Sequence, residues 1–261
     1  MKNRSFAKQE TEESSAKLAV LIDADNAQPS VFEYLLSEIA KYGEATVKRI
    51  YGDFTSPQSA QWRAILNEFA IKPVQQFAYT KGKNATDSTM IIDAMDLMYT
   101  RRFDGFCIVS SDSDFTSIAT RIREEGLLVY GFGKKTTPEA FKNACHVFVD
   151  TEIFAPSKPE RKSANRKNSE KHEFSKTEPS LPSKTVKAIA TALEQSSDDT
   201  GWSHLGTFGS ILLKLKSDFD PRQYGFKKLS EFVKGRSDLF EIQERKQANS
   251  ESIALYLRPK K

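Results

Sequence analysis

Between residues 18 and 150, short apolar runs alternate with longer amphipathic stretches. This alternation is typical of β-strands joined by crossover helices. Strands are expected at residues 18–22, 45–51, 72–78, 106–110, 127–131 and 146–149, and helices at residues 30–41, 58–69, 87–99, 115–125 and 138–144. Gly43 and Gly126 follow two of these helices, where a glycine in the left-handed conformation commonly ends the last turn. The pattern predicts an α/β fold with a doubly wound, mostly parallel sheet flanked by helices.

The pattern changes after residue 155. Residues 156–181 are rich in Ser, Lys, Arg, Pro and Glu, with Phe174 as the sole aromatic residue, which predicts a flexible basic linker. Beyond it, apolar residues recur at helical spacing in three short segments, and two strands follow at 240–242 and 253–257. Three helices and a hairpin predict a small winged-helix domain, with Phe226, Leu229, Phe232 and Val233 on the third helix. The expected organisation is a disordered tail at 1–16, an α/β domain at 17–155, the linker at 156–181 and the second domain at 182–261.

Composition fits this division. The chain has 261 residues, 38% hydrophobic and 28% charged, which suits two modest domains with some unstructured length. No apolar run approaches the roughly 20 residues that span a bilayer, and the polar N-terminus lacks the features of a secretory signal, so we expect a cytoplasmic protein without membrane contact. Cys107 and Cys145 are expected to be reduced structural thiols. The net charge of +4 weakly favours a polyanionic partner.

Acidic and polar residues follow the predicted strands. Asp23, Asp25 and Asn26 come after the first strand, Asp53 after the second, and Ser110, Ser111, Asp112 and Asp114 after the fourth, while Asp87 opens the helix after the third. Because ligands bind outside the carboxyl ends of parallel strands, carboxylates from four separate segments should meet at one edge of the sheet.

Crowded carboxylates repel one another, and a bound cation relieves that repulsion. Oxygen ligands without His or Cys favour Mg²⁺ or Mn²⁺, and such an ion supports hydrolysis of a nucleic acid backbone. Lys81 and Lys83, which flank Gly82 before Asp87, are candidates for contact with a phosphate.

Each of these residues also has an ordinary structural interpretation. Asp is a common helix cap and turn residue after a strand, and Asp114 stands just ahead of a helix. Asp25, Asn26 and Asp114 could therefore support the ligands, hold a second ion through water, or only cap a helix. Ser110 and Ser111 could bond a phosphate or satisfy backbone groups. Asp93 and Asp96 point away from Asp87 on the same helix, and for them the structural role is expected.

Four ordered motifs resemble those of the NYN domains, a PIN-like group of nucleases, in the LabA-like branch. They occupy residues 21–26, 83–87, 91–97 and 109–115. The resemblance implies a PIN-like sheet and a ribonuclease that depends on Mg²⁺ or Mn²⁺. It places the catalytic and metal-binding acids at Asp23, Asp87 and Asp112, with Asp53 and Asp114 as further metal ligands and Asp25, Asn26, Ser110 and Ser111 in support.

Residues 224–233, with the sequence YGFKKLSEFV, make the C-terminal part similar to a LOTUS (OST-HTH) domain. That resemblance implies RNA binding and sometimes a protein partner. Lys227 and Lys228 supply cations, and Tyr224, Trp202 or His204 could stack on bases.

Two other functions are compatible with the sequence. Asp23-Ala24-Asp25 after an apolar strand is similar to the nucleophile and acid of haloacid-dehalogenase phosphatases, although the residues that follow fit that family less well. Alternatively, the protein is a non-catalytic RNA-binding or scaffold protein that works through its C-terminal domain.

Overall fold

The computed structural model of the protein describes residues 15–55, 60–77, 85–154, 181–246 and 253–260. The expected tail and linker lie outside the described residues, except for residues 15, 16 and 181 at their ends. Lys81 and Lys83 also lie outside them.

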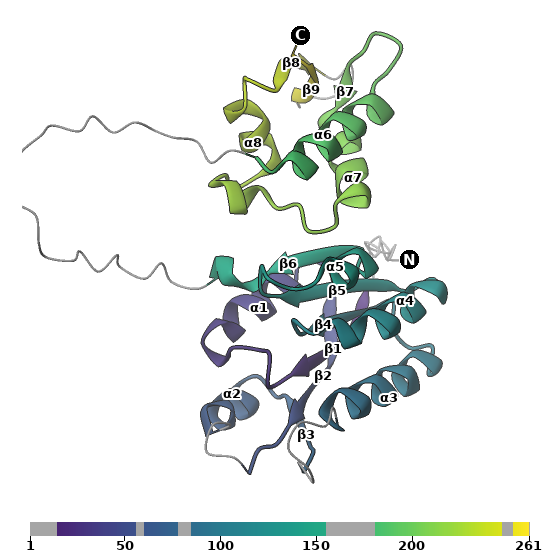
Figure 1. The fold of residues 1–261 in the computed structure, drawn as a ribbon, viewed down its shortest axis with the longest axis vertical. Helices are drawn as coiled ribbons and strands as arrows, with labels where there is room; N and C mark the ends of the chain where they lie inside the picture. The colour runs from purple at the N-terminus through teal and green to yellow at the C-terminus, as the bar shows by residue number, and fades with distance from the viewer. Residues whose placement is uncertain (1–14, 56–59, 78–84, 155–180, 247–252, 261) are drawn as a thin grey trace, which may run out of the picture.

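A six-stranded parallel sheet forms the first domain, in the order β3-β2-β1-β4-β5-β6 (Figure 1). Its strands are β1 (Lys17–Asp23), β2 (Glu44–Gly52), β3 (Lys72–Gln75), β4 (Gly105–Val109), β5 (Leu128–Gly133) and β6 (Val147–Asp150). The chain proceeds outward from β1 to β3 on one side and from β4 to β6 on the other. The order of the strands therefore reverses between β1 and β4, and the doubly wound sheet expected from the pattern is confirmed.

Helices cover both faces of this sheet. They are α1 (Phe32–Ile39), α2 (Trp62–Glu68), α3 (Ala85–Tyr99), α4 (Thr116–Glu124) and α5 (Glu139–Ala144), with 3-10 turns at Pro29–Val31, Ser113–Phe115 and Thr151–Phe154. One buried cluster packs α3, α4 and α5 against Leu21 and Phe106, and a second packs α1 and α2 against Val20 and Ile50. Successive residues of β1 point to opposite faces, so both clusters draw on it, and Leu18 to Ile22 are fully buried.

The second domain packs three helices against a small antiparallel sheet of order β7-β9-β8. The helices are α6 (Ser183–Ser196), α7 (Leu205–Leu215) and α8 (Leu229–Gly235), the strands β7 (Ser203–His204), β8 (Phe240–Lys246) and β9 (Ile253–Pro259), and a 3-10 turn covers Pro221–Tyr224. A separate core gathers around Phe208 and Phe232. The winged-helix arrangement of helices and hairpin is as expected, but Phe226 lies before α8 and not on it.

The domains meet along the edge strand β6. The amide of Phe148 in β6 donates a 2.8 Å hydrogen bond to the carbonyl of Ser217, and the Ser217 hydroxyl donates a 2.7 Å bond to the carbonyl of Lys142. Ser217 belongs to the turn after α7, so the second domain covers part of an edge strand whose backbone would otherwise face solvent.

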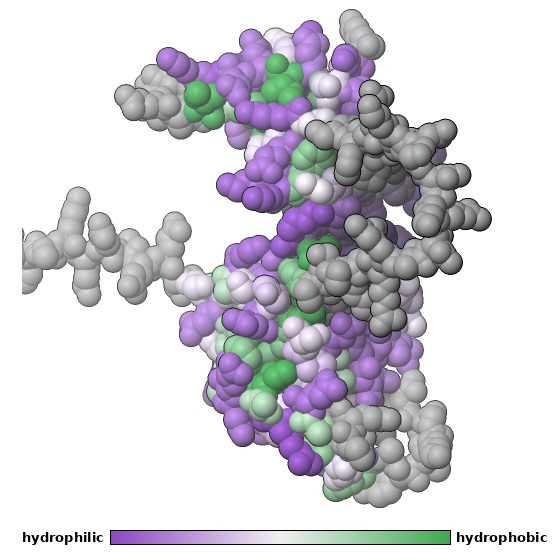
Figure 2. Space-filling view, turned by 90° about the vertical axis from the view of Figure 1, so that its left-hand side faces the viewer, coloured by the Kyte–Doolittle hydropathy of each residue, from purple (hydrophilic) through white to green (hydrophobic). Residues whose placement is uncertain are grey.

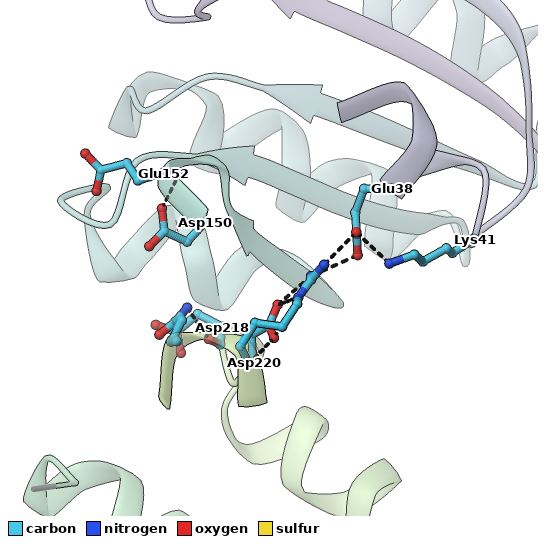
Figure 3. Close-up of polar contacts among 8 residues, drawn as sticks. Glu38, Lys41, Asp150, Glu152, Asp218 and Asp220 are labelled. Atoms are coloured by element: carbon cyan, nitrogen blue, oxygen red, sulfur yellow. Dashed lines mark hydrogen bonds and ion pairs between the residues drawn. The ribbon is translucent and has the colours of Figure 1, made fainter. Parts of the chain in front are cut away.

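Charged side chains also meet at the boundary between the domains, among them Glu38, Lys41 and Asp220 (Figure 3). The guanidinium of Arg222 donates to both carboxylate oxygens of Glu38 in α1, at 2.8 and 3.0 Å, and also pairs with Asp220. The ammonium of Lys142 lies 3.6 Å from a carboxylate oxygen of Asp218. Glu38 and Lys142 are buried. The domains are therefore joined mainly by ion pairs and hydrogen bonds.

The face shown in Figure 2 is mostly hydrophilic, with its apolar residues in small separate patches. Across the described part of the chain, no helix combines the length and apolar character needed to cross a bilayer.

Candidate metal centre

β1 delivers Asp23 to the point where the strand order reverses. It pairs with β2 and β4 on either side, and Asp23, its last residue, is 1% exposed. The carboxylate accepts hydrogen bonds from the backbone amide of Asp25 (3.0 Å), the side-chain amide of Asn26 (2.7 Å) and the hydroxyl of Ser110 (2.8 Å). A buried carboxylate with three donors is held in one orientation.

The segment after β4 supplies the next carboxylates. Asp112 caps the 3-10 turn at Ser113–Phe115, and its side chain accepts the amide of Asp114 at 2.9 Å. The hydroxyl of Ser110 accepts the amide of Asp112 at 3.1 Å, while the Ser111 hydroxyl accepts the amide of Lys134 at 2.9 Å. Capping therefore fixes this loop with both aspartates at the sheet edge.

Asp87 stands in the first turn of α3. One carboxylate oxygen from each of Asp87, Asp112 and Asp114 lies within 4.8 Å of the other two, and we name these residues the acid cluster. Among the described residues, no Lys or Arg side chain lies within ion-pair distance of the Asp87 carboxylate. The carboxylates of the acid cluster are therefore close together, and that of Asp87 has no cationic partner among the described residues.

Electrostatics extend this group beyond the acid cluster. Burial raises the pKa of Asp87 to about 6, aided by the charges of Asp23, Asp112, Asp114 and Asp25 in that order. Burial also raises the pKa of Asp25, and the charges of Asp23 and Asp53 raise it further, in that order. Asp53, just after β2, accepts hydrogen bonds from Thr55 and Gln75. Every acid expected from the strand ends therefore lies in one electrostatic neighbourhood.

Asp93 and Asp96 lie apart from this group. The carboxylate of Asp93 accepts hydrogen bonds from Arg49 and Tyr51 of β2, so it ties α3 to the sheet. Asp96 is exposed. Their expected structural role agrees with these positions.

The predicted RNA-binding residues of the second domain have different surroundings. Lys227 and Lys228 are exposed just before α8. The ring of Tyr224 instead stacks on that of Phe219, and its centroid lies 5.8 Å from the ring centroid of Phe232, in a tilted arrangement. The Tyr224 hydroxyl lies 3.4 Å from the hydroxyl of Thr185. Tyr224 is thus anchored against the core of the domain.

Sequence reasoning named Trp202 but missed the arginine and tyrosine side chains that form a surface with it beside β9. The guanidinium of Arg245 lies 5.4 Å from the ring centroid of Trp202 and 4.2 Å from that of Tyr256, and Arg258 lies 4.6 Å from Trp202. The alternation of Tyr256 and Arg258 with buried Leu255 and Leu257 could have revealed an outward face.

The model of the NYN domain family matches residues 17–153. The chain belongs to the NYN family. A second model, that of the OST-HTH/LOTUS domain, matches residues 173–251, so both resemblances, in the expected order, are confirmed. NYN domains are part of the PIN-like nuclease superfamily, and both domain types are associated with RNA.

Solved structures similar to this NYN protein include an uncharacterized protein from Nitrosomonas europaea, with 47% identity, covering 37% of this chain and 91% of that one, at a TM-score of 0.30. A protein of unknown function from Vibrio parahaemolyticus shows 19% identity, covers 54% of this chain and 95% of its own, and has a TM-score of 0.45. A protein fragment from Chromobacterium violaceum shows 32% identity, covers 28% of this chain and 77% of its own, and has a TM-score of 0.24. No curated protein matches the chain.

Proposed function

We propose that this NYN protein is a metal-dependent ribonuclease that hydrolyses RNA phosphodiester bonds at the acid cluster. The supporting observation is the gathering of oxygens from Asp87, Asp112 and Asp114 within 4.8 Å of one another. Two of these residues follow β4 and one stands in the first turn of α3, so the carboxylates come from two separate segments of the fold.

The donor set suits Mg²⁺ or Mn²⁺. The acid cluster offers carboxylate oxygens and no His or Cys, and hard divalent cations prefer such ligands. Asp23 adds a fixed negative charge beside the cluster, and Asp25 and Asp53 extend the acidic field. When bound, such an ion activates water and stabilises charge on the phosphate.

The chain's own residues hold and orient this centre. Ser110 and Asn26 fix the Asp23 carboxylate, and the cap formed by Asp112 fixes the loop that carries Asp114. Lys227 and Lys228 are exposed cations suited to contact RNA, and tethering this second domain raises the local concentration of RNA at the acid cluster.

A phosphatase with Asp23 as the nucleophile fits the geometry poorly. Its carboxylate is 1% exposed, and both oxygens already accept hydrogen bonds. A nucleophile needs a free oxygen facing the substrate.

Labelled single-stranded RNA incubated with Mg²⁺, Mn²⁺ or a chelator tests the proposal. We expect cleavage with a divalent ion and none with chelator. Asp87→Asn and Asp112→Asn should each lose at least about a hundredfold in rate, since each removes a charge that holds the ion. Asp96→Asn, an exposed acid on the same helix as Asp87, is the matched control and should retain full activity.

Thermal denaturation gives a second readout that does not need turnover. A divalent ion that binds the folded state should stabilise the wild type and raise its melting temperature. At a hundredfold excess of ion over its Kd, the free energy of unfolding should increase by about 2.7 kcal/mol. Asp87→Asn should lose this stabilisation. RNA binding without metal-dependent cleavage or stabilisation would instead support a non-catalytic RNA-binding protein.

A further inference from the structure

A cavity of about 350 Å³ lies between the two domains, on the opposite face of the sheet from α1. The first domain lines it with Arg123, Asn143, Cys145 and His146, and the second with Leu213, Lys214, Leu215 and Ser217. Its volume falls at the lower end of the roughly 300 to 1,000 Å³ of small-ligand pockets. We name it the cationic cavity, because its charged or titratable side chains other than the Cys145 thiol are basic.

Its positive groups are not neutralised. Arg123 donates to the carbonyl of Asn143 at 2.9 Å, and among the described residues neither Arg123 nor Lys214 forms an ion pair with a carboxylate. No Asp or Glu lines the cavity. Cations gathered from two domains without a counter-charge attract an anion.

His146 adds a hydrogen-bond donor of fixed direction. Its Nδ1 accepts the amide of Val129 at 3.0 Å. Burial and then the charge of Arg123 lower its pKa, which favours the neutral ring. In a neutral ring whose Nδ1 accepts, Nε2 carries the proton and donates.

The cavity is separate from the proposed catalytic centre. Arg123 is in the last turn of α4, and His146 immediately precedes β6, so both lie at the amino ends of the strands. The acid cluster lies at their carboxyl ends, roughly one strand length or about 17–20 Å away. A ligand in the cavity would therefore not be the phosphate under attack.

We propose that the cationic cavity binds a phosphate group between the two domains. Arg123 and Lys214 supply its charge complement, and His146 and Ser217 supply uncharged polar contacts. The phosphate belongs either to the RNA backbone, away from the scissile bond, or to a free phosphate ester. The site does not depend on catalysis by the acid cluster.

Binding experiments on the full chain test this proposal. One arm titrates a fluorescent unstructured RNA oligonucleotide in chelator at several salt concentrations, and the other titrates inorganic phosphate while NMR follows the His146 ring. The variants are Lys214→Ala, Arg123→Gln and their combination. Lys187→Ala and Arg102→Gln, exposed cations of the same two domains outside the cavity, are the matched controls.

If the ligand is an RNA phosphate, the combined variant should bind RNA about tenfold more weakly, and the slope of log K against log salt should fall by about 0.7 for each lost contact. If the ligand is a free phosphate ester, inorganic phosphate should shift the His146 signals in the wild type and controls but not in the variants, with RNA binding unchanged. Either outcome supports the site.

The proposal is overturned if neither probe distinguishes the cavity variants from the controls. Arg123 also donates a hydrogen bond to Asn143, so its replacement affects the fold as well as the cavity. Lys214 is exposed on α7, so Lys214→Ala removes a cavity cation without disturbing the fold. Glu38→Lys gives an independent check: Glu38 lies outside the cavity, but its loss should separate the domains and weaken phosphate binding as well.

Discussion

Ser110 joins two carboxylate-bearing segments through one hydroxyl. It donates to Asp23 at the end of β1 and accepts the amide of Asp112 after β4, and it is 1% exposed. The relative position of these two acids therefore depends on the Ser110 side chain.

Ser110→Ala tests this positioning role. The buried Asp23 carboxylate loses a donor, which should cost about 1–3 kcal/mol of stability. Metal affinity should fall by about ten- to a hundredfold, because the acids are no longer held in place. Mn²⁺ titration measures the affinity, and chemical denaturation measures the stability.

Ser111→Ala is the matched control, since that hydroxyl accepts the amide of Lys134 instead. It should leave metal affinity near the wild-type value. Similar affinity losses in both variants would contradict a specific role for Ser110.

At single residues, sequence predicts the acids well because topology places them. Any residue after a parallel strand must reach the carboxyl edge, so Asp23, Asp53 and Asp112 could be selected without coordinates. Asp114 was expected as a further ligand from the family resemblance, but its place in the acid cluster depends on how the cap at Asp112 turns the loop. Tyr224 was expected to stack on RNA bases, but its ring is anchored by contacts with Phe219 that sequence proximity does not reveal.

Helix ends show where element-level prediction succeeds and fails. Gly126 follows α4 with φ of +79°, as expected for a left-handed stop. Gly43 does not have a positive φ. A Cβ at this position would lie 2.2 Å from the carbonyl oxygen of Ala16, so glycine is required here by the close approach of the two backbone segments. Ala70 and Arg101 take positive φ after α2 and α3, where no glycine marks the turn.

Gly126→Ala should lower the free energy of unfolding by about 1 kcal/mol. An alanine held in the left-handed conformation destabilises the folded state by roughly 1–2 kcal/mol. Alanine also lowers the conformational entropy of the unfolded chain, which offsets about 0.4–1 kcal/mol of that loss. No heavy atom lies within 4 Å of the added Cβ, so only the backbone conformation contributes. Urea denaturation measures the difference.

Gly43→Ala provides the contrast, because its Cβ collides with backbone. Its loss should be clearly larger than that of Gly126→Ala. An unchanged stability of Gly126→Ala would show that the turn relaxes without strain.

Element bounds fail where tertiary packing overrides the local pattern. The third strand was expected to reach residue 78, but β3 ends at Gln75, after its ladder with β2 is complete. Phe226 has helical spacing with Leu229 and Val233, yet Gly225 turns the chain at φ of +85° before α8 begins. Phe226 still packs on Phe232, so its apolar character was informative although its element was not.

At the scale of the whole molecule, sequence indicated two domains but not their contact. The hydrogen bond between Arg222 and Glu38 joins residues 184 positions apart. Arg222 also pairs with Asp220, and Glu38 also pairs with Lys41, each of them close in sequence. Local patterns do not show that these pairs combine into one network. The cationic cavity is lined by residues of both domains, so it depends on their docking.

Glu38→Gln should loosen the docked arrangement. It keeps the shape of the side chain but replaces charge-assisted hydrogen bonds, worth about 1.5–3 kcal/mol, with weaker neutral ones. Small-angle scattering should show a larger radius of gyration. Lys41→Gln is the matched control, because Lys41 pairs with Glu38 within the same domain and should leave the dimensions unchanged.

The same carboxylate gives the contact a pH dependence. Burial alone would raise the pKa of Glu38, but the hydrogen bonds and charges of Arg222 and Lys41 outweigh it and lower the pKa below its ordinary value of 4.5. A group with a lowered pKa contributes its stabilisation in full above the ordinary value and loses it as pH falls through the lowered one. The wild type should therefore remain compact at about pH 5 and expand only in stronger acid. The two proteins differ only at residue 38, so the difference between the scattering profiles of wild type and Glu38→Gln isolates the contribution of Glu38. Parallel profiles from about pH 7 to pH 3 would show that the Glu38–Arg222 bond does not hold the domains together.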